Sequence, residues 1–338
     1  MTGDSAPKLT VCLPTYNRAA YLRQTLSSIL GQTLGDFELI VGDNCSTDAT
    51  RDVIAVVRDP RIRYVRHETN IGHYRNMNRC MELARGRYLC IVHDDDIYAP
   101  EFLARESELL DRHPNVGMVH CAVYAVNPER QRLRICRAYS RTGVRESRRE
   151  FIRYLGGHNV CCSTVMFRRT LFEAVGPFNA DLMCGDWLMW LQFALRADIG
   201  FVATPLVEMR QHVARMTATM DPMAWATEFL EILQQGLQML ERTDPSLAAS
   251  RVRFERYGVT GQGKRFWVAA LAAATEGNTD EAHGYINVLQ MLQARGLPRW
   301  YARTAWALAS PLGRRVLQPV RTIHRQLGRA MLEQRASW

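Results

Sequence analysis

The sequence predicts an α/β domain of strands joined by helices, followed by an all-helical region. In the first two-thirds of the chain, short apolar runs alternate with amphipathic stretches, which is the pattern of a repeating βα fold. From about residue 222 onward the pattern is helical only. The chain has 338 residues, of which 47% are hydrophobic and 23% charged, so it can bury two cores. A disordered or fibrous protein is excluded.

Four buried strands are expected in the first hundred residues, at 9–14, 37–43, 62–67 and 87–96. The helices between them are expected at 19–31, from a cap at 46–48 to residue 57, and at 77–84. In the first helix, Leu22, Leu26 and Ile29 recur at helical spacing. Parallel strands joined by helices place their ligand-binding loops at the carboxyl edge of the sheet. The loops after residues 13, 42 and 92 are therefore the first candidates for a site.

The rest of the α/β domain is expected to contain helices at 100–112 and 186–197, and strands at 117–126, 163–169 and 201–212. The pattern does not fix the direction of the strand at 117–126. Residues 127–150 are rich in arginine and weakly patterned, which predicts a mobile surface segment.

Five helices are expected after that, at 223–242, 246–257, 262–276, 279–295 and 299–309. The turn at 277–282 joins two of them as a helical hairpin, with Thr279 or Asp280 as the cap. We expect two domains, a catalytic domain at 1–215 and a helical region at 216–338 that ends in a basic amphipathic tail at 295–338.

The composition bears on location and redox state. No apolar run reaches the roughly 18 residues that cross a bilayer, and the start of the sequence lacks the pattern of a secretory signal. We expect a cytoplasmic protein, either free or peripheral at the inner face of the membrane. Nine cysteines without CxxC spacing predict reduced, buried thiols and argue against a thiolate metal site.

The net charge of +9 is concentrated at the end of the chain. Residues 295–338 hold nine arginines and one acid, Glu333. The remainder is close to neutral, so a general nucleic-acid surface is excluded. Apolar residues recur in this tail every three or four positions, with Pro319 interrupting them: Leu312, Val316, Val320, Ile323, Leu327 and Met331.

Two interpretations of this tail remain open. The apolar stripe either lies on an anionic membrane, where insertion and basic charge add, or packs on the helical region with the arginines toward water. A membrane-bound tail would suit a lipid-linked saccharide as acceptor. A packed tail leaves a soluble glycan, a peptide or a small molecule equally open.

Three adjacent acids, Asp94, Asp95 and Asp96, end an apolar strand. Their mutual repulsion calls for a positive partner. Mg²⁺ and Mn²⁺ bind carboxylate oxygens and often bridge to a substrate phosphate. A solvated loop in which one aspartate caps the next helix explains these three residues equally well.

Two later residues each have two interpretations. His212, in MRQH, is a further metal ligand if the fold brings it to a divalent cation, and otherwise a surface or packed histidine. Asp186 precedes Trp187 and Trp190 on an apolar helix. A carboxylate in such surroundings is either a general base with raised proton affinity or a helix cap.

The loops after the first two strands could hold a nucleotide. PTYNR at 14–18 offers polar side chains and an aromatic face, and Asp43 could accept a hydrogen bond from a pyrimidine N–H. The phosphate-loop patterns GxGxxG and GxxxxGK[ST] are both absent, which argues against a dinucleotide oxidoreductase or a P-loop NTPase.

Six segments of the sequence resemble glycosyltransferase family 2, the inverting GT-A enzymes, in order and spacing. They are LPTYNR, LIVGDNCSTD, NIGHYRNMN, ARGRYLCIVHDDD, VGPFNADLMCGDWLMWLQFAL and MRQH. The resemblance covers residues 8–215. It implies a GT-A (Rossmann-like) fold with a mixed, mostly parallel sheet flanked by helices.

The resemblance also implies an activity: inverting, metal-dependent transfer of a sugar from a nucleoside-diphosphate sugar, with UDP or dTDP expected, to an acceptor hydroxyl. The cofactor would be Mn²⁺ or Mg²⁺, and the acceptor a glycan, a lipid-linked saccharide or a small molecule. A noncatalytic scaffold with the same fold is the alternative. A nucleotidyltransferase is disfavoured because no Gly-rich basic loop is seen near the start. Whether the chain forms a homo-oligomer stays open.

The family's functional residues map onto this sequence. The resemblance implies that Asp186 is the catalytic base and that Asp95, Asp96 and His212 bind the metal. The residues implied to contact the nucleotide or the donor sugar are Pro14, Thr15, Tyr16, Asn17, Arg18, Asp43, Asn70, Gly72, Arg75, Asn78 and Asp94.

The sequence departs from the family pattern at four positions. Asn44 and Cys45 replace an Asp and a Gly of the common DDGS segment, which leaves the nucleotide open. His93 takes the place of the first Asp of the DXD motif. Gly185 stands where an acid often precedes the base, so the role of base falls on Asp186.

The expected chemistry needs both the acids at 94–96 and the carboxylate of Asp186. A departing diphosphate accumulates negative charge, which a bound cation neutralises. An acceptor hydroxyl is a poor nucleophile and needs a carboxylate to take its proton during the attack. One displacement inverts the anomeric carbon without a nucleophile from the enzyme.

Overall fold

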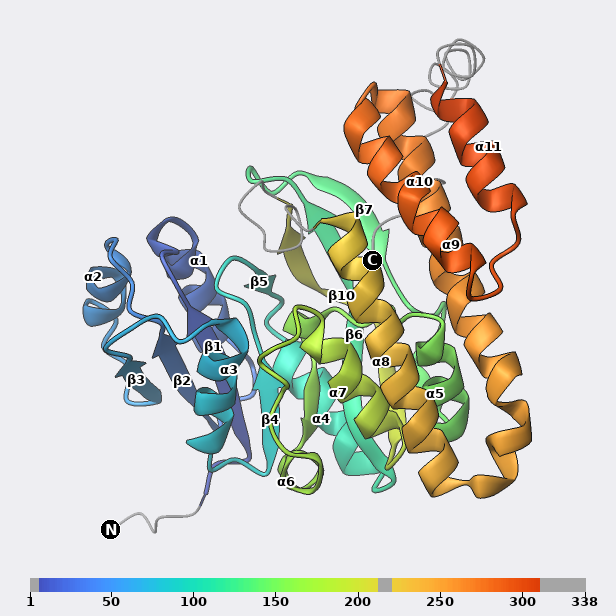
Figure 1. The fold of residues 1–338 in the computed structure, drawn as a ribbon. Helices are drawn as coiled ribbons and strands as arrows, with labels where there is room; N and C mark the ends of the chain where they lie inside the picture. Colours follow the sequence, from blue (N-terminus) through green and yellow to red (C-terminus); the bar gives the residue numbers. More distant parts are fainter. Residues whose placement is uncertain (1–5, 212–220, 311–338) are drawn as a thin grey trace. The chain divides into compact units, whose positions relative to one another are not determined.

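The computed structural model describes residues 6–211 and 221–310. The chain forms two compact units, one made of residues 1–150 and 159–212 and the other of residues 151–158 and 213–338 (Figure 1). The short segment 151–158 therefore belongs with the helical residues, which the sequence pattern did not predict.

The first unit is built on one mixed sheet. Within the described residues it has ten strands, in the order β3-β2-β1-β4-β9-β6-β10-β5, with β7 beside β6 and β8 beside β10. The strands are β1 (Leu9–Thr15), β2 (Phe37–Asp43), β3 (Ile62–Arg66), β4 (Tyr88–Ile91), β5 (Ile97–Tyr98), β6 (Val116–Val126), β7 (Arg132–Cys136), β8 (Gly143–Arg145), β9 (Met166–Arg168) and β10 (Asp198–Arg210).

The sheet contains both parallel and antiparallel ladders, and its two longest ladders are parallel. β1 pairs in parallel with β2 and β4, β2 with β3, and β6 with β10. β9, β5, β7 and β8 pair antiparallel with their neighbours. Every residue of β1 and β2 is buried, as expected for parallel strands covered on both faces. The predicted fold class is confirmed.

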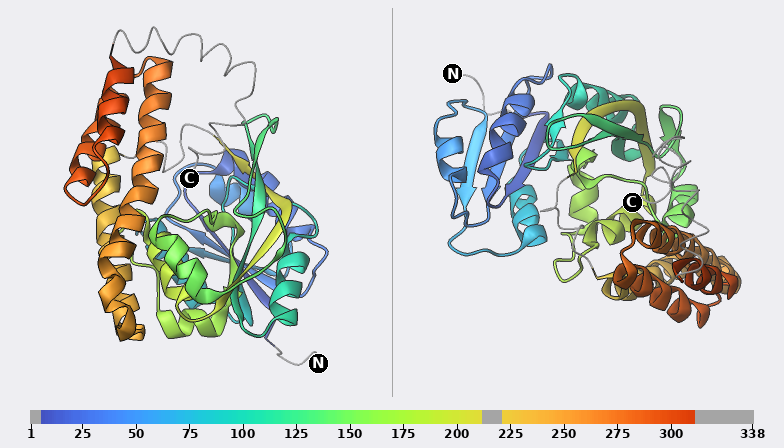
Figure 2. Two further views of the ribbon diagram at one scale, coloured as in Figure 1. Left: turned by 90° about the vertical axis from the view of Figure 1, so that its right-hand side faces the viewer. Right: turned by 90° about the horizontal axis from the view of Figure 1, so that it is seen from above.

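Helices follow the strands of this unit and can be traced in Figure 2. They are α1 (Ala19–Leu30), α2 (Thr50–Ala55), α3 (His73–Glu82), α4 (Phe102–Arg112), α6 (Arg169–Val175) and α7 (Gly185–Ala194), and α5 (Ser147–Leu155) runs into the second unit. α3 approaches β2 closely because Gly42 has no side chain: a Cβ there would lie 2.5 Å from the Cys80 Sγ and 2.6 Å from the Asn76 Oδ1. The helix that was predicted at 77–84 begins four residues earlier, at His73.

The prediction of a mobile segment at 127–150 is wrong. This segment forms β7, β8 and the start of α5. Its arginines hold edge strands in place: the Arg132 guanidinium lies 3.9 Å from the centre of the Tyr124 ring, and Arg130 pairs with Glu208 at 2.8 Å. Exposed edge strands carry charged residues instead of an apolar alternation, which is why the sequence pattern was weak.

The described part of the second unit is helical, with α8 (Pro222–Thr243), a 3₁₀ turn at Pro245–Ser250, α9 (Arg251–Glu276), α10 (Thr279–Gln293) and α11 (Trp300–Ala309). α8 has Pro222 in its first turn and the Asp221 carboxylate as its cap, accepting from the Ala224 N–H at 2.8 Å. Among the described helices, none has both the length and the apolar character to cross a membrane.

Two details of this unit differ from the prediction. α9 is one helix where two were expected, because its glycines are sites of close packing. A Cβ on Gly258 would lie 2.8 Å from the Leu155 carbonyl oxygen, and one on Gly261 would lie 2.5 Å from that of Gly156. The cap of α10 is Asn278, which accepts from the Glu281 N–H at 3.4 Å, and not Thr279 or Asp280.

Candidate functional site

The loops that follow β1 and β2 bind each other. The Asn17 side-chain oxygen accepts from the Thr47 N–H at 2.8 Å, and the Asn17 N–H donates to the Ser46 hydroxyl at 3.0 Å. These bonds hold Asn17 in the left-handed region, with φ of 52°. Tyr16 beside it is 43% exposed, so an aromatic face stands at the carboxyl edge of the sheet while Thr15 is buried.

Asp43 is buried at the end of β2 and fully engaged. Its carboxylate accepts from the Ser46 N–H at 2.8 Å and from the Tyr64 hydroxyl at 2.6 Å, and it lies 3.5 Å from the Arg66 Nε. Loss of hydration, and then the bond to Asp43, raise the pKa of Tyr64. Cys45 has φ of 66°, a backbone region that favours glycine, which gives the reason for a glycine in the common family pattern.

Asn44 ties the β2 loop to the segment before α3. Its amide donates to the Asn70 side-chain oxygen at 2.8 Å, and its own oxygen accepts from the Ile71 N–H at 2.8 Å. Asn70 also accepts from the N–H of Gly72, whose φ is 88°. The replacement of an Asp by Asn at position 44 therefore supplies an N–H donor that this tie uses.

α3 connects this edge to residues 178–186. The Asn78 side chain is buried, and it accepts from and donates to the backbone of Phe178 at 2.9 Å each. Arg75, which is exposed, pairs with Asp181 at 3.0 Å. The residues implied to bind the donor thus also position the segment that leads to Asp186.

The acidic loop 94–96 follows β4 and is anchored from several sides. The Asp96 carboxylate accepts from the Ser163 hydroxyl at 2.7 Å and from the Arg210 N–H at 3.0 Å. The Thr25 hydroxyl donates to the carbonyls of Asp94 and Asp96 at 3.1 and 2.8 Å. Asp96 is therefore fixed by β9, β10 and their flanks, and the loop does not behave as a solvated turn.

Asp94 lies in the crowded part of this loop. It accepts from the Tyr16 N–H at 3.3 Å, and Arg18 lies 3.7 Å from its carboxylate and 4.0 Å from that of Asp95. Burial, and then the neighbouring Asp95 charge, raise the pKa of Asp94 to about 7. Adjacent carboxylates of like charge favour the binding of a further cation at this loop.

Three side chains could hold that cation together. His93, Asp95 and Asp96 each offer a ligand atom, and these atoms lie within 4.8 Å of one another. Two carboxylates and an imidazole are a donor set that fits Mn²⁺ as well as harder cations. Of the predicted metal ligands, the structure brings Asp95 and Asp96 together and adds His93, whereas His212 lies outside the described residues.

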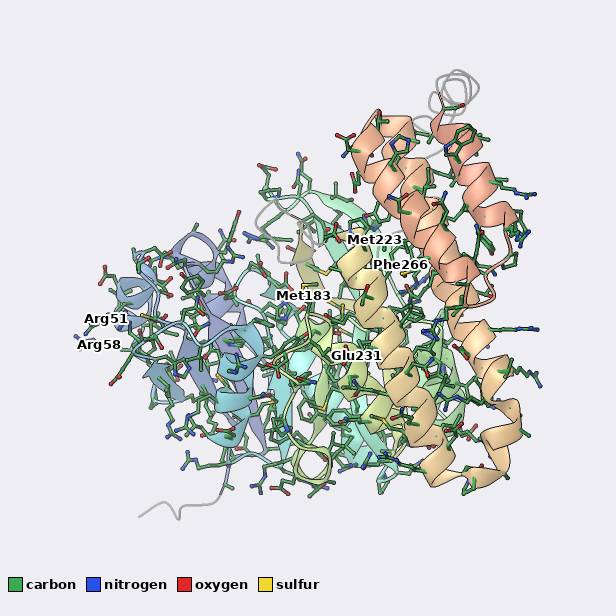
Figure 3. All side chains as sticks on the ribbon, in the orientation of Figure 1. Arg51, Arg58, Met183, Met223, Glu231 and Phe266 are labelled. Carbon is green, nitrogen blue, oxygen red and sulfur yellow. The ribbon has the colours of Figure 1, made fainter. Side chains whose placement is uncertain are left out.

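Asp186 lies in the first turn of α7. Its Oδ1 accepts from the Trp187 N–H at 2.9 Å and lies 3.3 Å from the Tyr74 hydroxyl, and its own N–H donates to that hydroxyl at 3.1 Å. The Tyr74 ring stacks on Phe178 with 5.4 Å between centres. Met183, labelled in Figure 3, supplies a carbonyl oxygen 3.1 Å from the same hydroxyl.

The start of α3 links the two groups of carboxylates. The His73 ring lies 5.1 Å from the Tyr74 ring and 6.1 Å from the His93 ring, measured between centres. Burial, and then the His93 charge, lower the pKa of His73 to about 4, so it is neutral at physiological pH. Sequence reasoning missed His73 and Tyr74, although both stand in the NIGHYRNMN segment that carried the resemblance.

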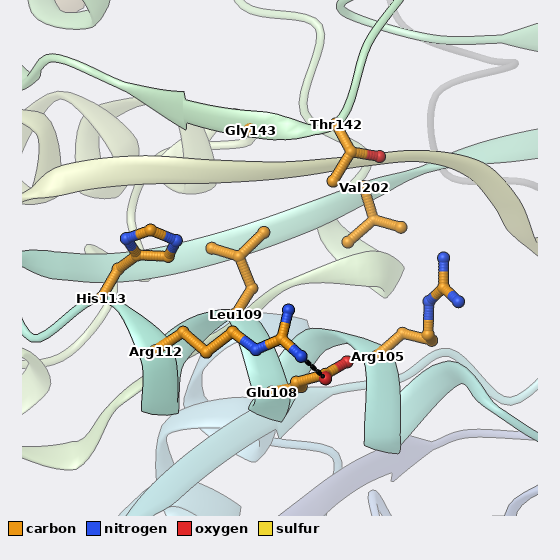
Figure 4. Close-up of a pocket in the computed structure, with 8 residues that line it drawn as sticks. All are labelled: Arg105, Glu108, Leu109, Arg112, His113, Thr142, Gly143 and Val202. Atoms are coloured by element: carbon orange, nitrogen blue, oxygen red, sulfur yellow. Dashed lines mark ion pairs between the residues drawn. The ribbon is translucent and has the colours of Figure 1, made fainter.

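A separate cleft of about 400 Å³ lies between α4 and the strands β8 and β10 (Figure 4). Arg105, Arg112 and His113 line it, and Arg112 pairs with Glu108 at 2.5 Å. None of the predicted site residues is among the residues that line it. Its chemistry is that of a polar surface groove, and it does not contribute to the site.

Comparisons with known proteins agree with this arrangement. The family model described as "Glycosyl transferase family 2" matches residues 10–176. A "PGL/p-HBAD biosynthesis glycosyltransferase" of Mycobacterium bovis is 34% identical over 188 residues, which is 54% of this chain and 68% of the relative.

Two solved structures share the fold. S. aureus TarS, residues 1–349, in complex with UDP-GlcNAc, superposes with a TM-score of 0.63 at 18% identity, covering 94% of this chain and 92% of the other. The mannosyltransferase PcManGT of Pyrobaculum calidifontis, in complex with GDP-Man and Mn²⁺, gives 0.52 at 19% identity, covering 95% and 84%. With its GT-A fold, its family match and this mycobacterial relative, the chain belongs to glycosyltransferase family 2 and is a glycosyltransferase.

Proposed function

We propose that this glycosyltransferase transfers a sugar from a UDP- or dTDP-sugar to an acceptor hydroxyl, with inversion and with the help of a divalent cation. The observation that carries the proposal is that residues at the start of α3 contact both the acidic loop and the segment that holds Asp186. The cluster His93–Asp95–Asp96 and the carboxylate of Asp186 are joined by the contacts of His73 and Tyr74.

On the donor side, His93, Asp95 and Asp96 would hold Mn²⁺ or Mg²⁺. The bound cation would neutralise the charge of the departing diphosphate. Arg18, 3.7 Å from Asp94, adds a fixed positive charge at this edge. The exposed ring of Tyr16 would stack on the nucleotide base. The loop that carries Tyr16 is held by the hydrogen bond between Asn17 and Ser46.

On the acceptor side, Asp186 would act as the general base. The acceptor oxygen attacks the anomeric carbon as the bond from that carbon to the diphosphate oxygen breaks, and the acceptor proton passes to the Asp186 carboxylate. A single displacement of this kind inverts the anomeric configuration. The titratable neighbours Tyr74 and Cys162 do not compete for this role, because loss of hydration, and then the Asp186 charge, raise the pKa of each.

The likeness to other proteins supports the proposed classes of donor and acceptor. The TarS structure holds UDP-GlcNAc and the PcManGT structure GDP-Man with Mn²⁺, which supports a nucleotide-sugar donor and a cation here. The mycobacterial relative is named for PGL/p-HBAD biosynthesis. We propose an acceptor hydroxyl on a glycan, a lipid-linked saccharide or a small molecule.

Donor turnover tests the proposal. The full chain is incubated with UDP-, dTDP- and GDP-hexoses, with Mn²⁺ or with EDTA, and release of the nucleoside diphosphate is followed by chromatography. We expect one donor to turn over with Mn²⁺ and none with EDTA. If no donor binds or turns over with the cation present, the proposal is wrong.

We also propose that the catalytic domain ends near residue 215. The helical unit that follows it binds the surface of an anionic membrane. α11 presents Trp300 and Trp306, which are 49% and 62% exposed, with the exposed Arg303 between them and Arg299 before them. Tryptophans with arginines on one helix face suit the interface of an anionic bilayer. The arginine-rich sequence 311–338 follows directly.

Vesicle flotation tests this contact. We expect the full chain to float with phosphatidylglycerol vesicles and not with phosphatidylcholine vesicles, and we expect the double variant W300A/W306A to lose at least about half of the floated fraction, because each tryptophan contributes apolar insertion. Y257A removes a comparably exposed aromatic ring on α9 and is the matched control. A full chain that ignores both kinds of vesicle contradicts the proposal.

A further inference from the structure

The Tyr74 hydroxyl makes three contacts around the proposed base. It accepts the N–H of Asp186 at 3.1 Å, it lies 3.3 Å from the Asp186 Oδ1, and it lies 3.1 Å from the Met183 carbonyl oxygen. A phenol has one proton to donate. That proton can therefore go to the carboxylate when Asp186 is charged, and to the Met183 carbonyl when Asp186 is neutral.

The residue before the base is fitted to this tyrosine. Gly185 stands where the family often has an acid, and a Cβ at this position would lie 3.2 Å from the Tyr74 ring and 2.6 Å from the Asn179 carbonyl oxygen. The ring itself is fixed by stacking on Phe178, whose backbone is held by Asn78. The space of the missing side chain is thus taken by the Asn179 carbonyl oxygen and the Tyr74 ring.

We propose that Tyr74 is a positioning residue that holds the Asp186 carboxylate in the orientation and ionised state in which it accepts the acceptor proton. The inference rests on the proposed role of Asp186 as general base. A hydrogen bond to the charged form of a carboxylate favours that form. Once Asp186 has taken the proton, the Tyr74 hydroxyl can donate to the Met183 carbonyl oxygen instead. The tyrosine therefore keeps a hydrogen-bond acceptor when Asp186 is neutral.

The titratable groups that face Asp186 include the Tyr74 hydroxyl from α3 and the Cys162 thiol from the turn before β9, while Cys184 faces Tyr74 from the start of α7. Tyr74 and Cys162 stay neutral near physiological pH because loss of hydration raises the pKa of each. A change in the pH profile on removal of the Tyr74 hydroxyl therefore reports on its bond to Asp186.

The test compares Y74F with Y88F in the full chain. Tyr88 also donates from a buried ring to an aspartate, at 2.7 Å to the Asp111 Oδ1, but Asp111 lies at the end of α4 and none of the contacts described above joins this pair to the site. We measure kcat and KM for the fastest donor from pH 5 to pH 9, together with Tm and nucleoside-diphosphate affinity.

For Y74F we expect kcat to fall about tenfold, because a bond to a charged group is lost, with the KM for the donor unchanged within about twofold. The acidic limb of its kcat–pH profile should move to higher pH by about half a unit to one unit. Y88F should lower Tm and leave the pH profile in place. As a second variant, 3-fluorotyrosine at position 74 keeps the fold and donates more strongly, and it should move the limb to lower pH.

The outcomes separate this inference from the proposed function. If D186N is inactive while Y74F and the fluorinated variant keep the wild-type kcat and pH profile, Tyr74 has only a structural role and the inference is overturned. If D186N keeps its activity, Asp186 is not the base, and both the proposed function and the inference fail.

Discussion

The acidic loop 93–96 and the start of α7 both present carboxylates, but they hold them in different ways. Asp96 receives a hydroxyl and a backbone N–H from two other segments, at 2.7 and 3.0 Å, and its loop is tied again by Thr25. Asp186 receives the N–H of its own neighbour, Trp187, and the hydroxyl of Tyr74, which is 112 positions away in sequence.

The difference follows from where the two groups lie in the fold. The acidic loop leaves β4 in the middle of the sheet, and its donors come from the 3₁₀ turn before β9 and from the end of β10. α7 is a helix outside the sheet, and Tyr74 of α3 reaches its first turn. Each of these contacts comes from an element that is distant in sequence, so the loss of the Tyr74 hydroxyl removes a contact that α7 does not supply itself. The predictions below test this contrast.

The largest effect is expected at Asp186. The D186N variant keeps the shape of the side chain but cannot accept a proton, so we expect sugar transfer to slow roughly a thousandfold, with the affinity for nucleoside diphosphate unchanged. Turnover assays and calorimetry measure the two quantities. D52N changes the acid in the first turn of α2 in the same way and should remain active.

A loss of nucleotide affinity in D186N would contradict the separation of the two regions. It would mean that the start of α7 contributes to the donor side directly, and the assignment of distinct roles to Asp95 and Asp186 would be wrong.

The next effect is expected at Asp95. D95A removes one ligand of the proposed cation site, and we expect donor turnover to fall roughly a hundredfold together with a loss of Mn²⁺-dependent nucleotide binding. Electron paramagnetic resonance of Mn²⁺ measures the bound cation without turnover. E82A, on the exposed side of α3, is the control. Mn²⁺ binding that survives in D95A would show that the cluster His93–Asp95–Asp96 is not the cation site.

The smallest effect is expected at a third carboxyl, Glu106, which belongs to neither region. Glu106 of α4 is fully buried, and loss of hydration raises its pKa well above the usual value of 4.5. Between that value and the raised one, the folded chain keeps a proton that the unfolded chain releases, so unfolding becomes easier as pH rises through this window.

The E106Q variant removes this titration. We expect its Tm to exceed that of the wild-type chain by a few degrees at pH 8 and the difference to shrink toward pH 5, as measured by calorimetry. Catalysis should not change. An equal Tm difference at both pH values would contradict the origin of the effect in the ionisation of Glu106.

Much of the fold could be predicted because its signals are local. The apolar runs at 9–14 and 37–43 form buried parallel strands, as expected, and the family assignment is confirmed. The strand β7 was missed because Arg132 and the preceding Arg130 contact Tyr124 and Glu208, which lie on other strands. Glu208 lies 78 positions from Arg130, outside any local window of sequence.

The site was predicted in the same uneven way. The resemblance supplied Asp95, Asp96 and Asp186, and their roles stay predictions. Tyr74 and His73 were missed because their importance lies in contacts with residues 183–186 and 93, which sequence spacing does not encode. The tail at 312–331 lies outside the described residues, so its two interpretations remain as they were.

The double attachment of α3 bears on attempts to redesign specificity. Asn44 and Asn70 bind each other ahead of this helix, and Asn78 grips Phe178 near its end. A chimera that exchanges only residues 70–78 would remove the Asn78 and Tyr74 side chains that bind residues 178–186, and would misplace Asp186. Residues 70–78 and 178–186 should be exchanged as one cassette, even though they are distant in the gene.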